Sequence, residues 1–168
     1  GFGDEDPREF GLDGAVEFPP HKLCKDMPDM HDTLTILDPA YEGHAKAYTD
    51  VINRSLSEKP PAFPLVKTVV PHWDNDARRE GRGFTMHGST PALYESWLQG
   101  AVKYAQTNPF NDEPIVFINA WNEWAEGAYL EPDVHYGHAY LNATKRAVHG
   151  LTSVRDRQKL LLVGHDAY

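Results

Sequence analysis

The run Pro114-Ile-Val-Phe-Ile-Asn-Ala120 is followed at once by the polar run Trp121-Asn-Glu-Trp-Ala-Glu-Gly127. The first run is apolar at consecutive positions, which is typical of a parallel strand buried on both faces. The second run is rich in tryptophan and glutamate and predicts a loop over residues 121–135. In α/β proteins, loops at strand ends are where functional side chains gather.

Outward from this run, two further strands and three helices are expected. Strands are predicted at residues 15–18 and 65–70, because short apolar runs there are bounded by Pro, Gly and polar residues. The first helix is expected to begin near Asp38-Pro39 and to end at Pro60. The second begins at Ser89-Thr90-Pro91, where a hydroxyl cap precedes a proline in the first turn. The last is expected over residues 137–149, while residues 22–37 and 76–88 are expected to be irregular.

The elements alternate as strand, helix, strand, helix, strand, helix, which predicts a parallel sheet with crossover helices. Three strands neither close a barrel nor form an obvious doubly wound sheet. Polar clusters follow the three strands, at residues 17–21, 72–79 and 121–131. Since a (β/α)8 barrel carries its chemistry at the C-terminal ends of its strands, the predicted fold class is α/β, as the C-terminal part of a TIM-like barrel.

The bulk composition limits the classes of partner. The net charge of −9 argues against a nucleic-acid partner, because little here would neutralise a phosphate backbone. No apolar run approaches the roughly 20 residues of a transmembrane helix. The nine histidines lack the spacing of a metal motif, and no glycine-rich phosphate loop appears in the part expected to form the barrel. We therefore expect no metal and no cofactor.

Glu123 and Glu126 are the candidate catalytic residues. Two carboxylates three positions apart, flanked by Trp121 and Trp124, fit glycosidic chemistry. One carboxyl group exchanges a proton with the glycosidic oxygen, while the second handles the nucleophile or the developing positive charge. Indole faces stack on the apolar faces of sugar rings. The structural alternative is that backbone groups or an arginine satisfy these carboxylates and that the tryptophans belong to the core.

A second cluster follows the strand at residues 65–70. Trp73 is a candidate for stacking on a sugar, and Asp74 and Asn75 are candidates for hydrogen bonds with its hydroxyls. Arg78 or Arg79 would orient a carboxylate or bind a phosphate. The alternative is a solvated loop with an Asp–Arg pair.

Three further residues are weaker candidates for substrate contact. Glu17 lies within a strand pattern, where a charge needs a partner, so it is expected to point into the barrel mouth or at an arginine. His21 follows it in the same polar cluster. Glu131 either shapes the site or belongs to a structural turn.

These motifs together resemble the WbsX-type proteins, which belong to the glycoside hydrolase family 99-like group. The resemblance covers roughly residues 10–148. It rests on several motifs that agree in order and spacing: Val16-Glu-Phe-Pro-Pro-His21, Trp73-Asp-Asn75 with Arg78, Ser89-Thr-Pro91 with Trp97-Leu98, and the run from Phe117 to Asp133.

The resemblance implies a retaining enzyme on a (β/α)8 barrel. Glu126 would be the general acid/base, and Glu123 would assist attack by the sugar 2-hydroxyl. Asn122 would hold the substrate beside them. The hydrolases act on α-mannosidic linkages and commonly carry a histidine where this chain has Ala125, which leaves the sugar specificity open.

The resemblance also implies a longer parent protein. Residues 1–149 would be the C-terminal half of the barrel and residues 150–158 a linker. Residues 159–168 look like the start of a two-Rossmann glycosyltransferase domain. Such a parent would act on an oligosaccharide or polysaccharide during assembly of bacterial O-antigen or lipopolysaccharide, in the cytoplasm or at the inner membrane face. The alternative is a non-catalytic glycan-binding or scaffolding barrel, although binding alone does not require an acid/base pair.

Overall fold

The structure is a computed structural model that describes residues 5–150. The predicted linker beyond residue 150 and the predicted start of a further domain at 159–168 lie outside the described residues. None of the helices in the described range has the length and apolar character needed to cross a membrane.

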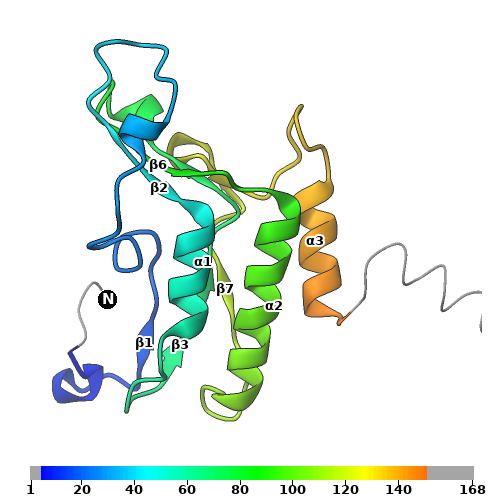
Figure 1. Cartoon of the computed structure of the whole chain (residues 1–168). Coiled ribbons are helices and arrows are strands. Elements are labelled where there is room, and N and C mark those ends of the chain that lie inside the picture. The colour runs from blue at the N-terminus through cyan, green and yellow to red at the C-terminus, as the bar shows by residue number, and fades with distance from the viewer. Residues whose placement is uncertain (1–4, 151–168) are drawn as a thin grey trace, which may run out of the picture.

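Parallel strands form the centre of the molecule (Figure 1). One pair places Ala15 opposite Leu65 and the other places Thr68 opposite Phe117, both in parallel register. The segment 65–69 holds two of these strands, separated only by Lys67. It therefore runs between the strand at Ala15–Val16 and the strand at Phe117–Ile118. This confirms the three predicted strands and their parallel direction. The strands are β1 (Ala15–Val16), β3 (Leu65–Val66), β4 (Thr68–Val69) and β7 (Phe117–Ile118).

Three helices lie side by side next to these strands (Figure 1). The second begins as the sequence predicts, since Thr90 Oγ1 accepts a hydrogen bond from the backbone N–H of Leu93 and Pro91 follows the cap. Its buried face packs against the other two helices and the strands, with Trp97 fully buried. The helices are α1 (Tyr48–Ser57), α2 (Pro91–Thr107) and α3 (Ala139–Val148).

The first helix begins ten residues later than the sequence predicts. Residues 38–47 form a turn and the strand β2 (His44–Ala47) instead. The Asp38 carboxylate accepts a hydrogen bond from the backbone N–H of Ala40, which stabilises a turn in place of a helical start. Ala45 matched the helical spacing but is buried within β2, so strand pairing outweighs the periodicity.

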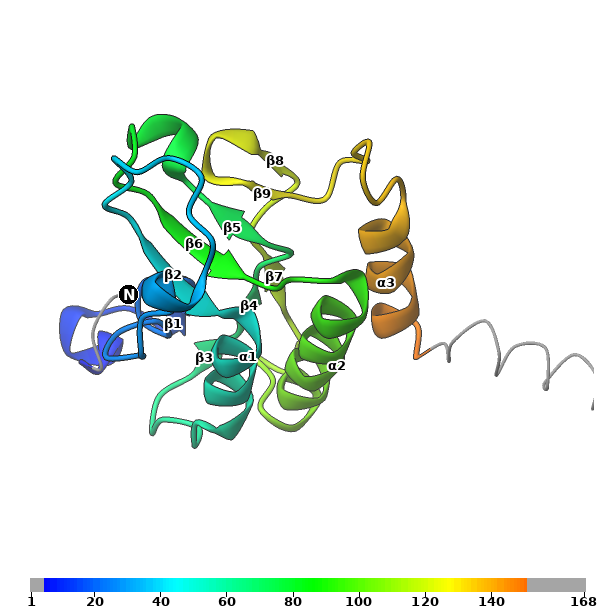
Figure 2. The same cartoon turned by 45° about the horizontal axis from the view of Figure 1, so that its top comes forward.

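A second small sheet extends from the parallel strands (Figure 2). Its strand order is β2-β6-β5, with β6 parallel to β2 and antiparallel to β5. The strand β6 and a short 3-10 helix replace the irregular stretch predicted for residues 76–88. These two elements were not predicted, because the segment is mostly polar. The elements are β5 (Trp73–Asp74), η3 (Asp76–Arg78) and β6 (Phe84–His87).

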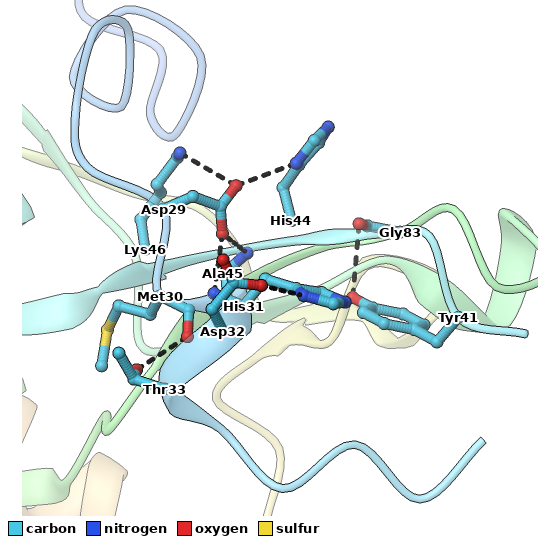
Figure 3. Close-up of polar contacts among 10 residues, drawn as sticks. All are labelled: Asp29, Met30, His31, Asp32, Thr33, Tyr41, His44, Ala45, Lys46 and Gly83. Atoms are coloured by element: carbon cyan, nitrogen blue, oxygen red, sulfur yellow. Dashed lines mark hydrogen bonds and ion pairs between the residues drawn. The ribbon is translucent and has the colours of Figure 1, made fainter. Parts of the chain in front are cut away.

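A long loop, residues 28–43, is fastened to β2 through Asp29 (Figure 3). One carboxylate oxygen accepts hydrogen bonds from the backbone N–H groups of His31 and Ala45. The other lies 2.8 Å from His44 Nδ1 and 3.2 Å from Lys46 Nζ. Burial alone would raise the pKa of Asp29, but these hydrogen bonds outweigh it and hold the pKa well below its ordinary value.

The two faces of the parallel strands differ. Val69 and Ile118 face the helical core, whereas Phe117, opposite Thr68, points to the other face and is 49% exposed. Val16 and Phe18 are exposed as well, and Val16 lies opposite Val66 on that same face. The expectation that the strand at 114–120 is buried on both faces is therefore wrong for the described residues, because Phe117 is half exposed on the second face.

Candidate active site

Two loops meet at the C-terminal ends of neighbouring parallel strands. The first follows β4 and carries β5 and η3. The second follows β7 and carries the hairpin of β8 (Asn122–Glu123) and β9 (Ala128–Tyr129), with η4 (Trp124–Glu126) at its turn. Because β4 and β7 pair directly, both loops begin side by side, and η3 contacts η4 (Figure 2). Two of the three polar clusters seen in the sequence are thus brought together.

Gly127 and His72 join the two loops. Gly127 has a φ of 57°, and a Cβ atom there would lie 2.8 Å from the backbone N and O of Asp74. Only glycine allows this approach without displacing one of the loops. The Gly127 carbonyl accepts a hydrogen bond from Nδ1 of His72. Burial lowers the pKa of His72, which favours the neutral ring.

Glu126 forms an ion pair with Arg78 across the same junction. The distance from Arg78 Nη2 to Glu126 Oε1 is 2.6 Å, and the Glu126 side chain is 15% exposed. The sequence alternative placed Arg78 in a pair with an aspartate of its own loop, but its partner is the candidate catalytic glutamate. This ion pair fixes one carboxylate oxygen of Glu126. Within residues 5–150, the Oε2 oxygen has no hydrogen-bond partner.

Glu123 lies three residues before Glu126 and is exposed. Its backbone pairs with Ala128 in the hairpin. In the described part of the chain its carboxylate makes no hydrogen bond or ion pair. Asn122, beside it on β8, is also exposed. These side chains are therefore open to a ligand.

Trp124 is held at the surface by two contacts. Its ring stacks on Tyr129 at a centroid distance of 3.7 Å and an interplanar angle of 14°. Its Nε1 donates a 2.6 Å hydrogen bond to Glu131 Oε2. The residue is still 48% exposed, and Trp121 is 53% exposed. Two indoles thus flank the carboxylates, and Glu131 orients one of them.

Tyr129 was not predicted as a site residue, whereas Asp133 belongs to the Glu131-Pro-Asp133 segment that was expected either to shape the site or to form a structural turn. The Tyr129 hydroxyl donates to Asp133 Oδ2 at 3.3 Å. Burial alone would raise the pKa of Asp133, but backbone N–H groups of Tyr136 and His135 bind the carboxylate and the pKa is lowered. Tyr129 could have been identified from the hairpin, because β9, which contains Tyr129, pairs with β8, which contains Asn122 and Glu123.

Two predicted residues of the first loop serve the fold. Trp73 is 1% exposed and packs in the hydrophobic core. Its ring has no exposed face for a sugar, so the expectation of stacking at Trp73 is wrong in this structure. Asn75 is 6% exposed, and its Oδ1 accepts a hydrogen bond from the backbone N–H of Phe84, which joins β5 to β6. Asp74 is exposed and accepts a hydrogen bond from the N–H of Asp76.

Glu17 and His21 are the remaining predicted residues, and their contacts are with Lys67 and with Phe18 and Trp73, respectively. Glu17 is 2% exposed and its partner is Lys67, at 2.8 Å, where an arginine or the barrel mouth was expected. The lysine also donates to the backbone carbonyl of Ser55 in α1, so this pair points toward the helices. His21 is exposed, with its ring stacked on Phe18 and edge-on to Trp73.

No group of three or more His, Cys, Asp or Glu side chains suited to holding a metal ion occurs among residues 5–150. The side chains at the loop junction are carboxylates, one arginine and exposed indoles.

Two carboxylates and two exposed indoles thus lie after β7, at the C-terminal end of a parallel strand in an α/β fold. The chain belongs to the WbsX glycosyltransferase family, whose model, described as "Glycosyltransferase WbsX", matches residues 1–144. This confirms the WbsX-type resemblance seen in the sequence.

Two curated relatives are similar to the chain. Both bear the name "Uncharacterized protein WxcX" and come from two strains of Xanthomonas campestris pathovar campestris. Each is 38% identical over 149 residues, which is 88% of this chain and 21% of the relative. The chain therefore spans about a fifth of the length of these relatives. No solved structure matches the chain.

Proposed function

We propose that the protein acts on glycosidic bonds, by transfer or by hydrolysis, with Glu126 and Glu123 as its catalytic carboxylates. The observation that carries the proposal is the junction of the two strand-end loops. There Glu126 pairs with Arg78 while Glu123 and two indoles stay exposed. A purely structural ion pair does not account for a second, unpartnered carboxylate beside exposed tryptophans.

The roles of the two carboxylates follow from their surroundings. Glu126 exchanges a proton with the glycosidic oxygen through Oε2, because Arg78 occupies Oε1. Glu123 assists attack by the sugar 2-hydroxyl, with net retention, in agreement with the resemblance to the family 99-like hydrolases. Trp121 and Trp124 hold the sugar by stacking, and Asn122 binds its hydroxyls.

We also propose that the parallel strands are part of a (β/α)8 barrel. The supporting features are the parallel register of β1, β3, β4 and β7, the helices on one face and the exposed apolar side chains on the other. Further strands of a closed barrel would cover Val16, Phe18 and Phe117, as barrel interiors are filled by side chains.

Assembly of bacterial surface polysaccharide, including O-antigen or lipopolysaccharide, is the proposed setting. Membership of a glycosyltransferase family supports a carbohydrate substrate and a role in polysaccharide synthesis. A cytoplasmic location and a covalently linked glycosyltransferase domain belong to the same proposal.

The test compares wild type with Glu126→Gln and Glu123→Gln in turnover of α-mannoside and O-antigen-type oligosaccharides. Glu113→Gln, an exposed carboxylate in the turn after α2, is the matched control. We expect each site variant to lose about 100-fold or more in kcat, the size of a general acid/base contribution, and the control to keep full activity. Equal turnover in all four proteins would refute the assignment.

A glycan-binding module is the second candidate, favoured by the exposure of Trp121 and Trp124. In that case wild type binds glycan without turnover, and both glutamine variants bind as tightly as wild type. Retained binding together with absent turnover would replace the enzymatic proposal with this one.

A further inference from the structure

Three arginines gather at one hollow beside the candidate active site. Arg78, Arg79 and Arg82, together with Glu80, line a surface hollow of about 600 Å³. The chain as a whole carries a net charge of −9, so this cationic surface stands out against an acidic molecule. A concave cluster of guanidinium groups is suited to oxyanions, because each guanidinium can offer two parallel N–H donors to one phosphate or carboxylate.

The backbone that carries these arginines is fixed by hydrogen bonds. Asp76 Oδ1 accepts from the backbone N–H groups of Gly81 and Gly83, at 3.0 and 2.9 Å. Gly83 lies directly against Asp76, since a Cβ atom there would be 2.5 Å from the Asp76 Cα. The two ends of the arginine-bearing turn are thereby held together. Binding an anion therefore requires ordering of side chains, with the turn already in place.

Among residues 5–150, two of the three guanidinium groups have no ionic partner. Across the described range 5–150, no carboxylate forms an ion pair with Arg79 or Arg82. Arg78 uses Nη2 for Glu126 and is itself 48% exposed. The Asp76 carboxylate accepts hydrogen bonds from backbone amides, and Glu80 is the carboxylate among the residues that line the hollow. The residues that line the hollow therefore carry three positive charges and one negative charge.

We propose that this hollow binds an anionic group of the saccharide substrate, either a phosphate or a uronate carboxylate. The assignment rests on the proposed function, because it names the substrate class of the same site. Arg78 belongs to both features, so the anion and Glu126 share one guanidinium. A substrate anion that takes the Nη2 donors of Arg78 would release Glu126 Oε1 and couple substrate binding to freeing of the acid/base carboxylate.

The test measures binding by calorimetry at low ionic strength, where exposed charges are least screened. The probes are glucose 1-phosphate, glucuronate and glucose, with wild type, the double variant Arg79→Gln/Arg82→Gln and Arg8→Gln. Arg8 is an exposed arginine in the first 3-10 helix and serves as the matched control. Circular dichroism confirms that each variant is folded.

We expect at least one anionic probe to bind at least tenfold more tightly than glucose. The double variant should lose this preference and Arg8→Gln should keep it. Preference for glucose 1-phosphate identifies a phosphate, and preference for glucuronate identifies a carboxylate. Equal affinity for all three probes in wild type, or an unchanged preference in the double variant, overturns the proposal.

Glu126→Gln separates this site from the catalytic proposal. Removal of the Glu126 charge frees Arg78, so the anion should bind at least as tightly as to wild type while turnover is lost. If anion binding depends on the arginines but wild type shows no turnover, the catalytic assignment fails and the anion site stands. Weaker anion binding in Glu126→Gln counts against the sharing of Arg78.

Discussion

Gly127 lies so close to Asp74 that a Cβ atom at position 127 would be 2.8 Å from both the N and the O of the Asp74 backbone. Gly127 belongs to the loop with the two candidate catalytic glutamates, and Asp74 belongs to the loop with Arg78. The distance between the loops, and hence the Glu126–Arg78 ion pair, depends on the absence of a side chain at this position.

Gly127→Ala should therefore impair both folding and activity. The added Cβ must push the loops apart, and an L-residue at a φ of 57° adds strain, so we expect a loss of about 2–4 kcal/mol in the free energy of unfolding. Urea unfolding and turnover assays measure the two effects. Gly137→Ala is the control, because Gly137 has a φ of 52° but no atom within 4 Å of the added Cβ. A loss in Gly137→Ala as large as that in Gly127→Ala would mean that backbone strain alone is responsible.

Tyr129 should contribute to glycan affinity through Trp124. Tyr129→Ala removes the surface on which the indole stacks, and we expect glycan binding to weaken about 5- to 10-fold, since aromatic pairs contribute about 1 kcal/mol. Tyr129→Phe keeps the ring and loses only the hydrogen bond to Asp133, so it should bind nearly as wild type does. Tryptophan fluorescence titration with oligosaccharide gives both affinities, and an equal loss in the two variants would assign the effect to the hydroxyl.

Replacing one member of the buried Glu17–Lys67 pair should lower the free energy of unfolding more than replacing both members. The side chains are 1% and 4% exposed, and burial raises the pKa of Glu17 even though Lys67 opposes this. Lys67→Met leaves an unpaired buried carboxyl group and should cost about 3–5 kcal/mol of unfolding free energy. The double variant Glu17→Gln/Lys67→Met should cost less than Lys67→Met alone. Additive losses in a double-mutant cycle would show that the pair is not coupled.

Asp29 should make the free energy of unfolding depend on pH in the acidic range. Its folded-state pKa is lowered, so its contribution is fully present above the unfolded pKa of about 3.9 and is lost as the pH falls through the folded pKa. Asp29→Asn should therefore be less stable than wild type at pH 7, by about 1 kcal/mol after solvent screening of this partly exposed group. The difference should shrink below about pH 4. Thermal unfolding of wild type, Asp29→Asn and the exposed control Asp112→Asn across this pH range measures the difference. A stability difference between Asp29→Asn and wild type that does not change with pH would contradict the prediction.

The predictable parts of the fold are those where local chemistry and tertiary packing agree. The cap at Thr90-Pro91 begins α2, and the apolar runs at 65–70 and 114–120 form parallel strands. The error at residues 38–47 arose because Tyr41 and Ala45 happen to continue the helical spacing of α1. Pairing of β2 with β6, which is distant in sequence, decides that segment, and helical periodicity does not report it.

The candidate site was predictable as a set of residue types but less so as an arrangement. Glu123, Glu126 and Arg78 were identified from their place after strands, and the structure joins two of them in an ion pair. Trp73 could not be assigned correctly, because an indole suits a core as well as it suits a sugar. Its burial depends on the segment around His21 and on β6, neither of which its local sequence reveals.

The direct pairing of β4 with β7 has a consequence for how such proteins can diverge. Adjacent strands lie about 4.8 Å apart whatever connects them, so the two loops start from neighbouring positions however long the intervening chain is. Changes in the length of α2 or of the turn at residues 108–113 would leave the meeting point of the loops in place. By contrast, a shift of one residue in the β4–β7 register would displace one loop along the other. Selection on activity should thus tolerate insertions in the crossover helix and exclude them from the last residues of either strand.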